Sequence, residues 1–250
     1  MKSKKISEIF NIKKGDIISI VGSGGKTTLM FELAKELKTQ YKVLVTTSTK
    51  IYEPSCNNFD YLYTNIEQYT KSKYSHKQEE NSVTVISKDI DLSKNKLIGI
   101  NDECFDLVIN DFDIVLVESD GSRNLPLKGW KEHEPSILLK TNKTVGVIPI
   151  DMMNKKINKE YIYGFEEFTK IVGDTDCLDK QAIGKICSSE LGIFKNSRGK
   201  LYLYINKTDD KKFIEDSLNL SKYLKKNIVG RPYDFEICFG SLKLGEFYEN

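Results

Sequence analysis

The sequence has few of the residues that build metal centres or cross-links. Its 250 residues include five cysteines and two histidines. The cysteines are far apart and form no CxxC pair, which argues against a structural zinc site and favours reduced thiols. Lys and Arg total 38 and Asp and Glu total 36, so the net charge of +2 gives no whole-chain argument for a nucleic-acid or membrane partner.

Long apolar runs are also missing. The basic N-terminal stretch, MKSKKISEIFNIKKGD, contains no apolar segment of signal-peptide length, and no later stretch approaches the length of a membrane span. No linker rich in Pro, Gly or Ser divides the chain, and no solenoid-length repeat is visible. We therefore expect a cytoplasmic protein with a single domain over residues 1–250 and no nucleic-acid or membrane partner.

What the sequence does have is a glycine-rich turn between an apolar strand and an amphipathic helix, IISIVGSGGKTTLM over residues 17–30. Glycines let successive backbone amides converge on an anion, and the start of the helix adds its positive dipole end. Lys26 would bind the β- and γ-phosphates of a nucleotide, and the Thr27 hydroxyl would ligate Mg²⁺. The predicted phosphate-binding residues are Gly22, Ser23, Gly24, Gly25, Lys26, Thr27 and Thr28.

This loop is a short form, because Ile20 stands where the usual eight-residue pattern has its first glycine. Fewer amides would then surround the phosphate. The alternative interpretation is an ordinary strand-to-helix turn with an incidental lysine.

The order of the apolar segments predicts an α/β fold. A strand over 16–21, a helix over 26–39 and a strand over 41–47 form a βαβ opening. Parallel strands joined in this way need helices on both sheet faces, so we predict a doubly wound, mostly parallel sheet in a three-layer sandwich of the P-loop NTPase type. Further strands are predicted over 82–87, 96–100, 113–118, 144–150 and 201–205, and further helices over 181–191 and 213–224. The polar segment 68–81 is predicted to be an exposed, mobile loop in which His76 is solvated.

Two carboxylates end a buried strand in the segment DIVLVESDGSR, residues 113–123. Glu118 and Asp120 are two residues apart and so project from one face, where either could hold Mg²⁺ together with Thr27. The alternative is a polar strand end whose acids cap the next turn. Gly121 would let a backbone amide approach a γ-phosphate, as switch segments do.

Further polar residues are expected at the same edge of the sheet. Thr49 and Lys50 follow the second strand and are predicted to contact phosphate, metal or substrate, although hydroxyl residues are also common in strands. The loop PLKGWKEHEP, residues 126–135, contains His133, which we predict as a catalytic residue beside Lys26, Glu118 and Asp120. A capped loop-to-helix transition is the simpler explanation of this loop.

The segment LYLYINKTDD places Asn206, Lys207 and Asp209 after an apolar strand in the NKxD order of GTP-binding proteins. An ionised Asp accepts hydrogen bonds only, so it matches the donors on the Watson–Crick edge of guanine and not the ring acceptor of adenine. These residue types are abundant here, so a chance match is the alternative. We expect GTP or ATP with Mg²⁺ as cofactors, GTP being slightly favoured.

Four segments together resemble the YqeC family of accessory proteins for selenium-dependent molybdenum hydroxylases: VGSGGKTTLM, VLVTTSTKIYEP, VLVESDGSRNLPLKGWKEHEP and LYLYINKTD. The resemblance implies a cytoplasmic P-loop protein that acts in the maturation or selenium loading of a molybdenum-cofactor enzyme, with that enzyme or its cofactor as partner. Many relatives have Gln where Lys207 stands, which weakens guanine recognition as a family property. The family pattern falls on residues 22–28, 47–50 and 118–123 and on Lys128, His133 and Glu134.

Three functions fit these features. The first is a metallochaperone-like NTPase whose bound nucleotide orders the segments around Ser48 and Gly121. This ordering would change the affinity of the protein for a client enzyme or cofactor. The second is a small-molecule kinase or ligase in which ATP or GTP activates a substrate, with His133 or Glu134 as base. The third is a module that binds nucleotide without hydrolysing it.

Overall fold

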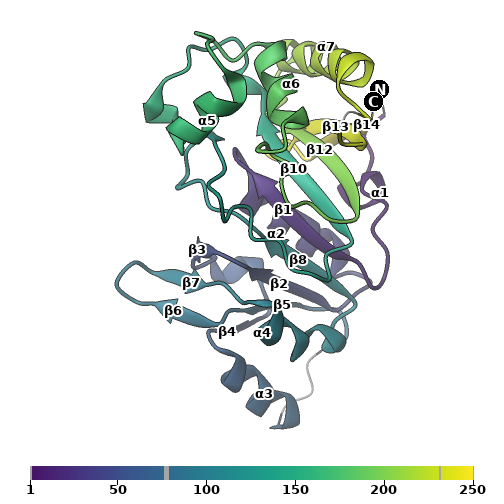
Figure 1. Ribbon diagram of the computed structural model, residues 1–250. Coiled ribbons are helices and arrows are strands. Elements are labelled where there is room, and N and C mark those ends of the chain that lie inside the picture. Colours follow the sequence, from purple (N-terminus) through teal and green to yellow (C-terminus); the bar gives the residue numbers. More distant parts are fainter. Residues whose placement is uncertain (1, 76–78, 231, 250) are drawn as a thin grey trace.

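The computed structural model describes residues 2–75, 79–230 and 232–249. Within these residues the main sheet has the order β14-β13-β12-β10-β1-β8-β2-β5-β4 (Figure 1). All neighbouring strands are parallel except β13 and β14, which are antiparallel. The strands are β1 (Ile17–Gly22), β2 (Val43–Thr47), β4 (Tyr61–Tyr63), β5 (Val83–Ile86), β8 (Ile114–Glu118), β10 (Lys143–Pro149), β12 (Lys200–Asn206), β13 (Phe235–Ser241) and β14 (Glu246–Glu249).

Helices cover both faces of this sheet. On one face, α1 (Ile6–Ile9) and α2 (Lys26–Leu37) pack on alternate strand residues such as Ile18 and Leu116. On the other face, α5 (Phe165–Val172), α6 (Lys180–Ser188) and α7 (Lys211–Asn227) pack over β10, β12 and β13, while α3 (Ile66–Ser75) and α4 (Asp102–Asp106) pack over β2, β5 and β8. The predicted doubly wound, three-layer α/β architecture is therefore confirmed.

The centre of the sheet determines where a ligand can bind. β1 is buried along its whole length and lies between β8 and β10. Because β1, β2, β8, β10 and β12 are parallel, their carboxyl ends meet at one edge, which is where open α/β sheets bind ligands. The Gly-rich turn, the acidic strand end and the NKxD segment all follow strands at this edge.

Two small sheets add to this edge. β3 (Lys50–Tyr52), β7 (Lys96–Ile98) and β6 (Asp89–Asp91) form an antiparallel sheet in the order β3-β7-β6, which extends beside the end of β2 (Figure 1). β9 (Leu127–Lys128) pairs with β11 (Ile162–Tyr163). The short 3-10 helices are η1 (Cys56–Asn58), η2 (Ile109–Asp111), η3 (Ile150–Met152) and η4 (Lys159–Tyr161). The strand predicted over 96–100 thus exists as β7, but outside the main sheet.

The prediction of a loop over 68–81 is wrong for residues 68–75, which belong to α3. Tyr69 is 1% exposed, and its hydroxyl donates to Asp111 Oδ2 at 2.9 Å, so one aromatic residue fixes an otherwise polar helix to the sheet. Residues 76–78, with the prediction for His76, lie outside the described residues.

Several boundaries and elements also differ from the predictions. The helix predicted over 26–39 ends at Leu37, and the one predicted over 181–191 ends at Ser188 because Ser189 is extended. The strands β13 and β14 and the helix α5 were not predicted at all. Of the helices in the described ranges, none combines the length and the apolar character that crossing a bilayer requires.

Candidate functional site

The turn between β1 and α2 has a backbone that needs glycine. Gly22, Gly24 and Gly25 have φ values of 97°, 74° and 137°, which side chains rarely adopt. A Cβ on Gly22 would lie 2.3 Å from the carbonyl oxygen of Val147, and one on Gly25 would lie 2.2 Å from Asn206 Nδ2. The glycines therefore allow the turn to pass close to the ends of β10 and β12.

Contacts from three other segments hold this turn in place. The Ser23 amide donates to the Val147 carbonyl at 3.0 Å, the Ser23 hydroxyl donates to the Pro126 carbonyl at 2.8 Å, and Asn206 Nδ2 donates to the Gly24 carbonyl at 2.8 Å. Within the described residues, the amides from Gly24 to Thr27 donate to no protein acceptor. Such amides at the start of a helix, here α2, are a ready binding site for an anion.

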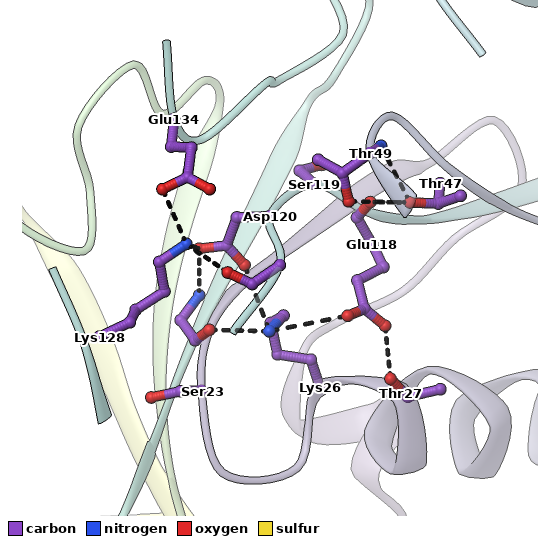
Figure 2. Close-up of polar contacts among 12 residues, drawn as sticks. Ser23, Lys26, Thr27, Thr47, Thr49, Glu118, Ser119, Asp120, Lys128 and Glu134 are labelled. Carbon is purple, nitrogen blue, oxygen red and sulfur yellow. Dashed lines mark hydrogen bonds and ion pairs between the residues drawn. The ribbon is translucent and has the colours of Figure 1, made fainter. Parts of the chain in front are cut away.

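Lys26 lies at the centre of the buried polar cluster in Figure 2. Its ammonium donates to the Gly22 carbonyl at 2.8 Å and lies 3.4 Å from Asp120 Oδ1 and 3.6 Å from Glu118 Oε1. Burial opposes the charge on Lys26, but the carboxylates of Asp120 and Glu118 outweigh it and raise the pKa of the ammonium. Lys26 therefore carries its positive charge at the turn at neutral pH.

Glu118 is the carboxylate that reaches the first turn of α2. Its Oε2 accepts a hydrogen bond from Thr27 Oγ1 at 2.6 Å, and its side chain lines the pocket beside the turn. Burial raises the pKa of Glu118, and Lys26 and the Thr27 hydroxyl offset this only in part. A hydroxyl and a carboxylate next to a phosphate site are the donors that Mg²⁺ uses with nucleotides.

Asp120 is placed differently, because it is fully buried between Lys128 and Lys26 (Figure 2) and does not line the pocket. Its Oδ2 accepts from the Gly22 amide at 3.0 Å and from Trp130 Nε1 at 2.8 Å, and it pairs with Lys128 Nζ at 3.2 Å. Asp120 thus stabilises the shape of the turn. From the sequence spacing alone, Asp120 and Glu118 were equally good candidates for binding Mg²⁺. In the part of the chain that the structure describes, no group of three or more His, Cys, Asp or Glu side chains could hold a metal by itself.

Lys128 extends this brace to the loop that follows. Its side chain is fully buried; Nζ donates to the Gly121 carbonyl at 2.8 Å and lies 3.3 Å from Glu134 Oε2. From the sequence, Lys128 stood out only through the family pattern, Glu134 was also a possible base of the kinase or ligase alternative, and Trp130 had no predicted role. No local signal in the sequence shows that Lys128 and Trp130 meet Asp120, or that Glu134 meets Lys128.

The other predicted residues of this edge separate into two groups. Lys50 and Gly121 line the pocket beside the turn, whereas Thr49 does not: its amide donates to Thr47 Oγ1 at 3.0 Å and so helps to shape the strand end. His133 is exposed and lines a different depression, with Asn196 and Arg198. The structure therefore does not bring His133 to the turn.

The NKxD segment is only partly brought to the turn. Asn206 touches Gly24 directly, as described above. Lys207 has a φ of 67° and pairs with Asp151 Oδ2 at 2.9 Å, and Asp209 is exposed and accepts from the Ser241 hydroxyl at 2.5 Å. Asn206 thus connects the glycine turn to the end of β12, and guanine recognition by Asp209 stays a prediction.

A family model described as YqeC protein matches residues 18–166, which are 149 of the 250 residues. The chain belongs to the YqeC family. A curated relative, the "Uncharacterized protein YqeC" of Escherichia coli (strain K12), is 28% identical over 189 residues, which cover 74% of this chain and 72% of the relative. The part that matches the YqeC model includes the turn, the acidic strand end and Lys128, whereas Asn206 and Asp209 lie beyond it.

Proposed function

We propose that this YqeC-family protein binds a nucleoside triphosphate with Mg²⁺ at the segment 22–28 and hydrolyses it slowly. The observation that carries the proposal is the convergence of Lys26, Thr27 and Glu118 beside unpaired amides at the start of α2. Anion-binding amides, a charged lysine and a hydroxyl–carboxylate pair are the parts that phosphoryl-transfer sites of this class need.

Each residue has a distinct part in this proposal. The amides of Gly24, Gly25 and Lys26 would bind phosphate oxygens, while the Lys26 ammonium would neutralise charge that develops between the β- and γ-phosphates. Thr27 and Glu118 would hold Mg²⁺, directly or through its waters, and the ion would supply further charge neutralisation. Asp120 would keep the turn in shape through the Gly22 amide.

The cellular role that we propose follows from the family resemblance: an accessory, metallochaperone-like NTPase in the maturation or selenium loading of a molybdenum-cofactor hydroxylase. The segments around Ser48 and Gly121 are suited to respond to the nucleotide. The Ser48 amide donates to the Glu118 carbonyl at 3.1 Å and its hydroxyl donates to the Ser136 carbonyl, so the loops at Ser48 and Ser136 meet at the end of β8. A change at Glu118 would reach both loops and the segment at Gly121 that follows β8.

The test is binding and turnover of GTP and ATP with Mg²⁺, measured by calorimetry and phosphate release. We expect the variant Lys26→Ala to lose binding, because the phosphates lose their principal cation. The variant Lys35→Ala, an exposed position on the same helix, is the control and should bind like the wild type. Equal binding by both variants would contradict the proposal.

The base preference is tested in the same assay. If Asn206 and Asp209 read guanine, GTP binds more tightly than ATP and the variant Asp209→Ala removes the difference. If ATP binds as well and Asp209→Ala changes nothing, the NKxD order is a chance match and the nucleotide is ATP.

A further inference from the structure

The pocket beside the phosphate loop extends to one side of β1. Its volume is about 350 Å³, and its walls come from the start of α2, from Glu118, from the segment 121–125 and from β3 and β7. These elements lie on the side of β8 and β2, whereas β10 and β12, with Asn206, lie on the opposite side and contribute none of the walls. A nucleotide with its base toward Asn206 would place its terminal phosphate at the mouth of this pocket.

Four cations line the pocket: Lys26 is paired with Glu118 and Asp120, whereas the described residues give Lys96 and Arg123 no carboxylate partner. Lys26, Lys50, Lys96 and Arg123 line it, and its carboxylate, Glu118, is already bound by Lys26 and Thr27. Lys50 has a long ion pair with Asp91, at 3.8 Å. Among the described residues, Lys96 and Arg123 have no carboxylate within ion-pair distance. A concave surface of one charge concentrates the field and favours ligands of the opposite charge.

These cations are held in place by the fold. Lys96 lies opposite Tyr52 in the β3–β7 pair, and its ammonium is 4.3 Å from the centre of the Tyr52 ring. The small sheet is fixed to the end of β2, because the Ile100 amide donates to the Thr47 carbonyl at 2.8 Å and a Cβ on Gly99 would meet Ser48 at 2.3 Å. The pocket wall is therefore joined directly to the end of the main sheet.

Arg123 comes from a second element. Its φ of 51° and that of Asn124, 62°, form a left-handed pair in a turn that the Leu125 amide closes on the Ser122 carbonyl at 2.9 Å. For residues other than glycine, this conformation costs free energy, and it occurs preferentially at functional sites. The turn places the Arg123 guanidinium 5.4 Å from the Tyr163 ring centre, at the edge of the pocket.

We propose that this pocket binds a second, anionic substrate, whose carboxylate or phosphate group lies against Lys50, Lys96 and Arg123 beside the γ-phosphate. This inference rests on the proposed nucleotide binding and adds the class of the second substrate. Arginine and lysine together are well suited to carboxylate and phosphate groups, since the guanidinium binds their paired oxygens and the ammonium adds a point charge.

The pocket chemistry also indicates what this substrate would do. Glu118 already accepts a hydrogen bond from Thr27, and His133 lines a different depression, so neither is placed to remove a proton from the substrate. An acceptor that is already ionised therefore fits better than a hydroxyl that must lose a proton. An oxygen of the carboxylate or phosphate would form a bond to the γ-phosphorus. The bond from that phosphorus to the bridging oxygen would break, and its electron pair would leave with the nucleoside diphosphate.

The test uses the full chain loaded with Mg²⁺, beryllium fluoride and ADP or GDP, whichever binds more tightly, so that the γ-position is filled. Malonate and inorganic phosphate are the two probes, and calorimetry measures their binding. We expect the variants Lys96→Gln and Arg123→Gln to weaken binding of a probe by about tenfold or more, as loss of one hydrogen bond to a charged group does. The control is Arg198→Gln, an exposed arginine outside the pocket.

Each outcome is distinct. Binding of malonate alone identifies a carboxylate acceptor, binding of phosphate alone identifies a phosphate acceptor, and binding of both supports an anion site without that selectivity. If neither probe binds, or if the two variants weaken diphosphate binding as much as probe binding, the cations serve the nucleotide itself and the inference is overturned. Failure of the wild type to bind any nucleotide would instead refute the proposed function; probe binding lost in Arg123→Gln would then still support the pocket.

Discussion

At the scale of single residues, Lys128 is a fully buried cation whose position is fixed by several contacts in the site. Its ammonium is removed from water and contacts two carboxylates, those of Asp120 and Glu134, as well as the Gly121 carbonyl. A buried cation of this kind compensates buried negative charge, so removing it leaves Glu134 without its ion-pair partner and Asp120 with Lys26 as its remaining cation. Lys128 therefore links the stability of the chain to the shape of the glycine turn.

The variant Lys128→Met should destabilise the protein by about 3–5 kcal/mol, the usual cost of breaking a buried ion pair from one side. Urea denaturation followed by circular dichroism measures this loss. The control is Lys38→Met, because the Lys38–Asp60 pair is 40% and 37% exposed and such pairs contribute less than about 1 kcal/mol. Similar midpoints for the two variants would show that the Lys128 contacts do not stabilise the fold.

At the scale of secondary-structure elements, the βαβ opening and the position of the glycine turn could be predicted, because an apolar strand, a Gly-rich turn and an amphipathic helix leave a local pattern. The helix α3 could not be predicted, because most of its residues are polar and its one buried aromatic residue, Tyr69, leaves no helical pattern. The three-residue strands β3 and β7 are too short for periodicity to identify. The pocket walls depend on them, so the positively charged pocket could not be predicted from the sequence.

Two other elements, α6 and β13, carry buried thiols that make stability depend on pH. Cys187 on α6 and Cys238 on β13 are buried among apolar side chains, and burial raises the pKa of both. The folded chain then keeps protons that the unfolded chain releases above about pH 8.5, the usual thiol pKa. The contribution of these two thiols to the free energy of unfolding is therefore fully present below that pH and is lost as the pH rises.

Between pH 8.5 and 10, each thiol should reduce the free energy of unfolding by up to about 1.4 kcal/mol per pH unit. Urea midpoints across this range measure the slope. The variant Cys238→Ala should make the slope shallower, whereas Cys56→Ala, an exposed cysteine, should leave it unchanged. A slope equal to the wild type in Cys238→Ala would mean that this thiol ionises equally well in the folded chain.

At the scale of the whole molecule, the glycine turn between β1 and α2 joins two parts of the sheet. Asn206 at the end of β12 holds the Gly24 carbonyl from one side, and Asp120 after β8 holds the Gly22 amide from the other. On one face of the sheet the cores beneath these strands are separate, one under α5–α7 and one under α3 and α4, whereas on the other face a single core under α1 and α2 spans both strands. A ligand on the loop would therefore restrain both parts and stabilise the chain as a unit.

Saturating nucleotide with Mg²⁺ should accordingly raise the melting temperature. At a concentration 100 times the Kd, binding adds about 2.7 kcal/mol, which corresponds to about 5–10 °C for a chain of this size. Removing Mg²⁺ with EDTA should abolish most of the rise, because Thr27 and Glu118 then have no cation to share with the phosphates. The variant Lys26→Ala should show almost no rise with or without the metal. If Lys26→Ala showed the same rise in melting temperature as the wild type, the nucleotide would bind away from the glycine turn. Within the described residues, no lysine other than Lys26 donates to the Gly22 carbonyl and could replace it.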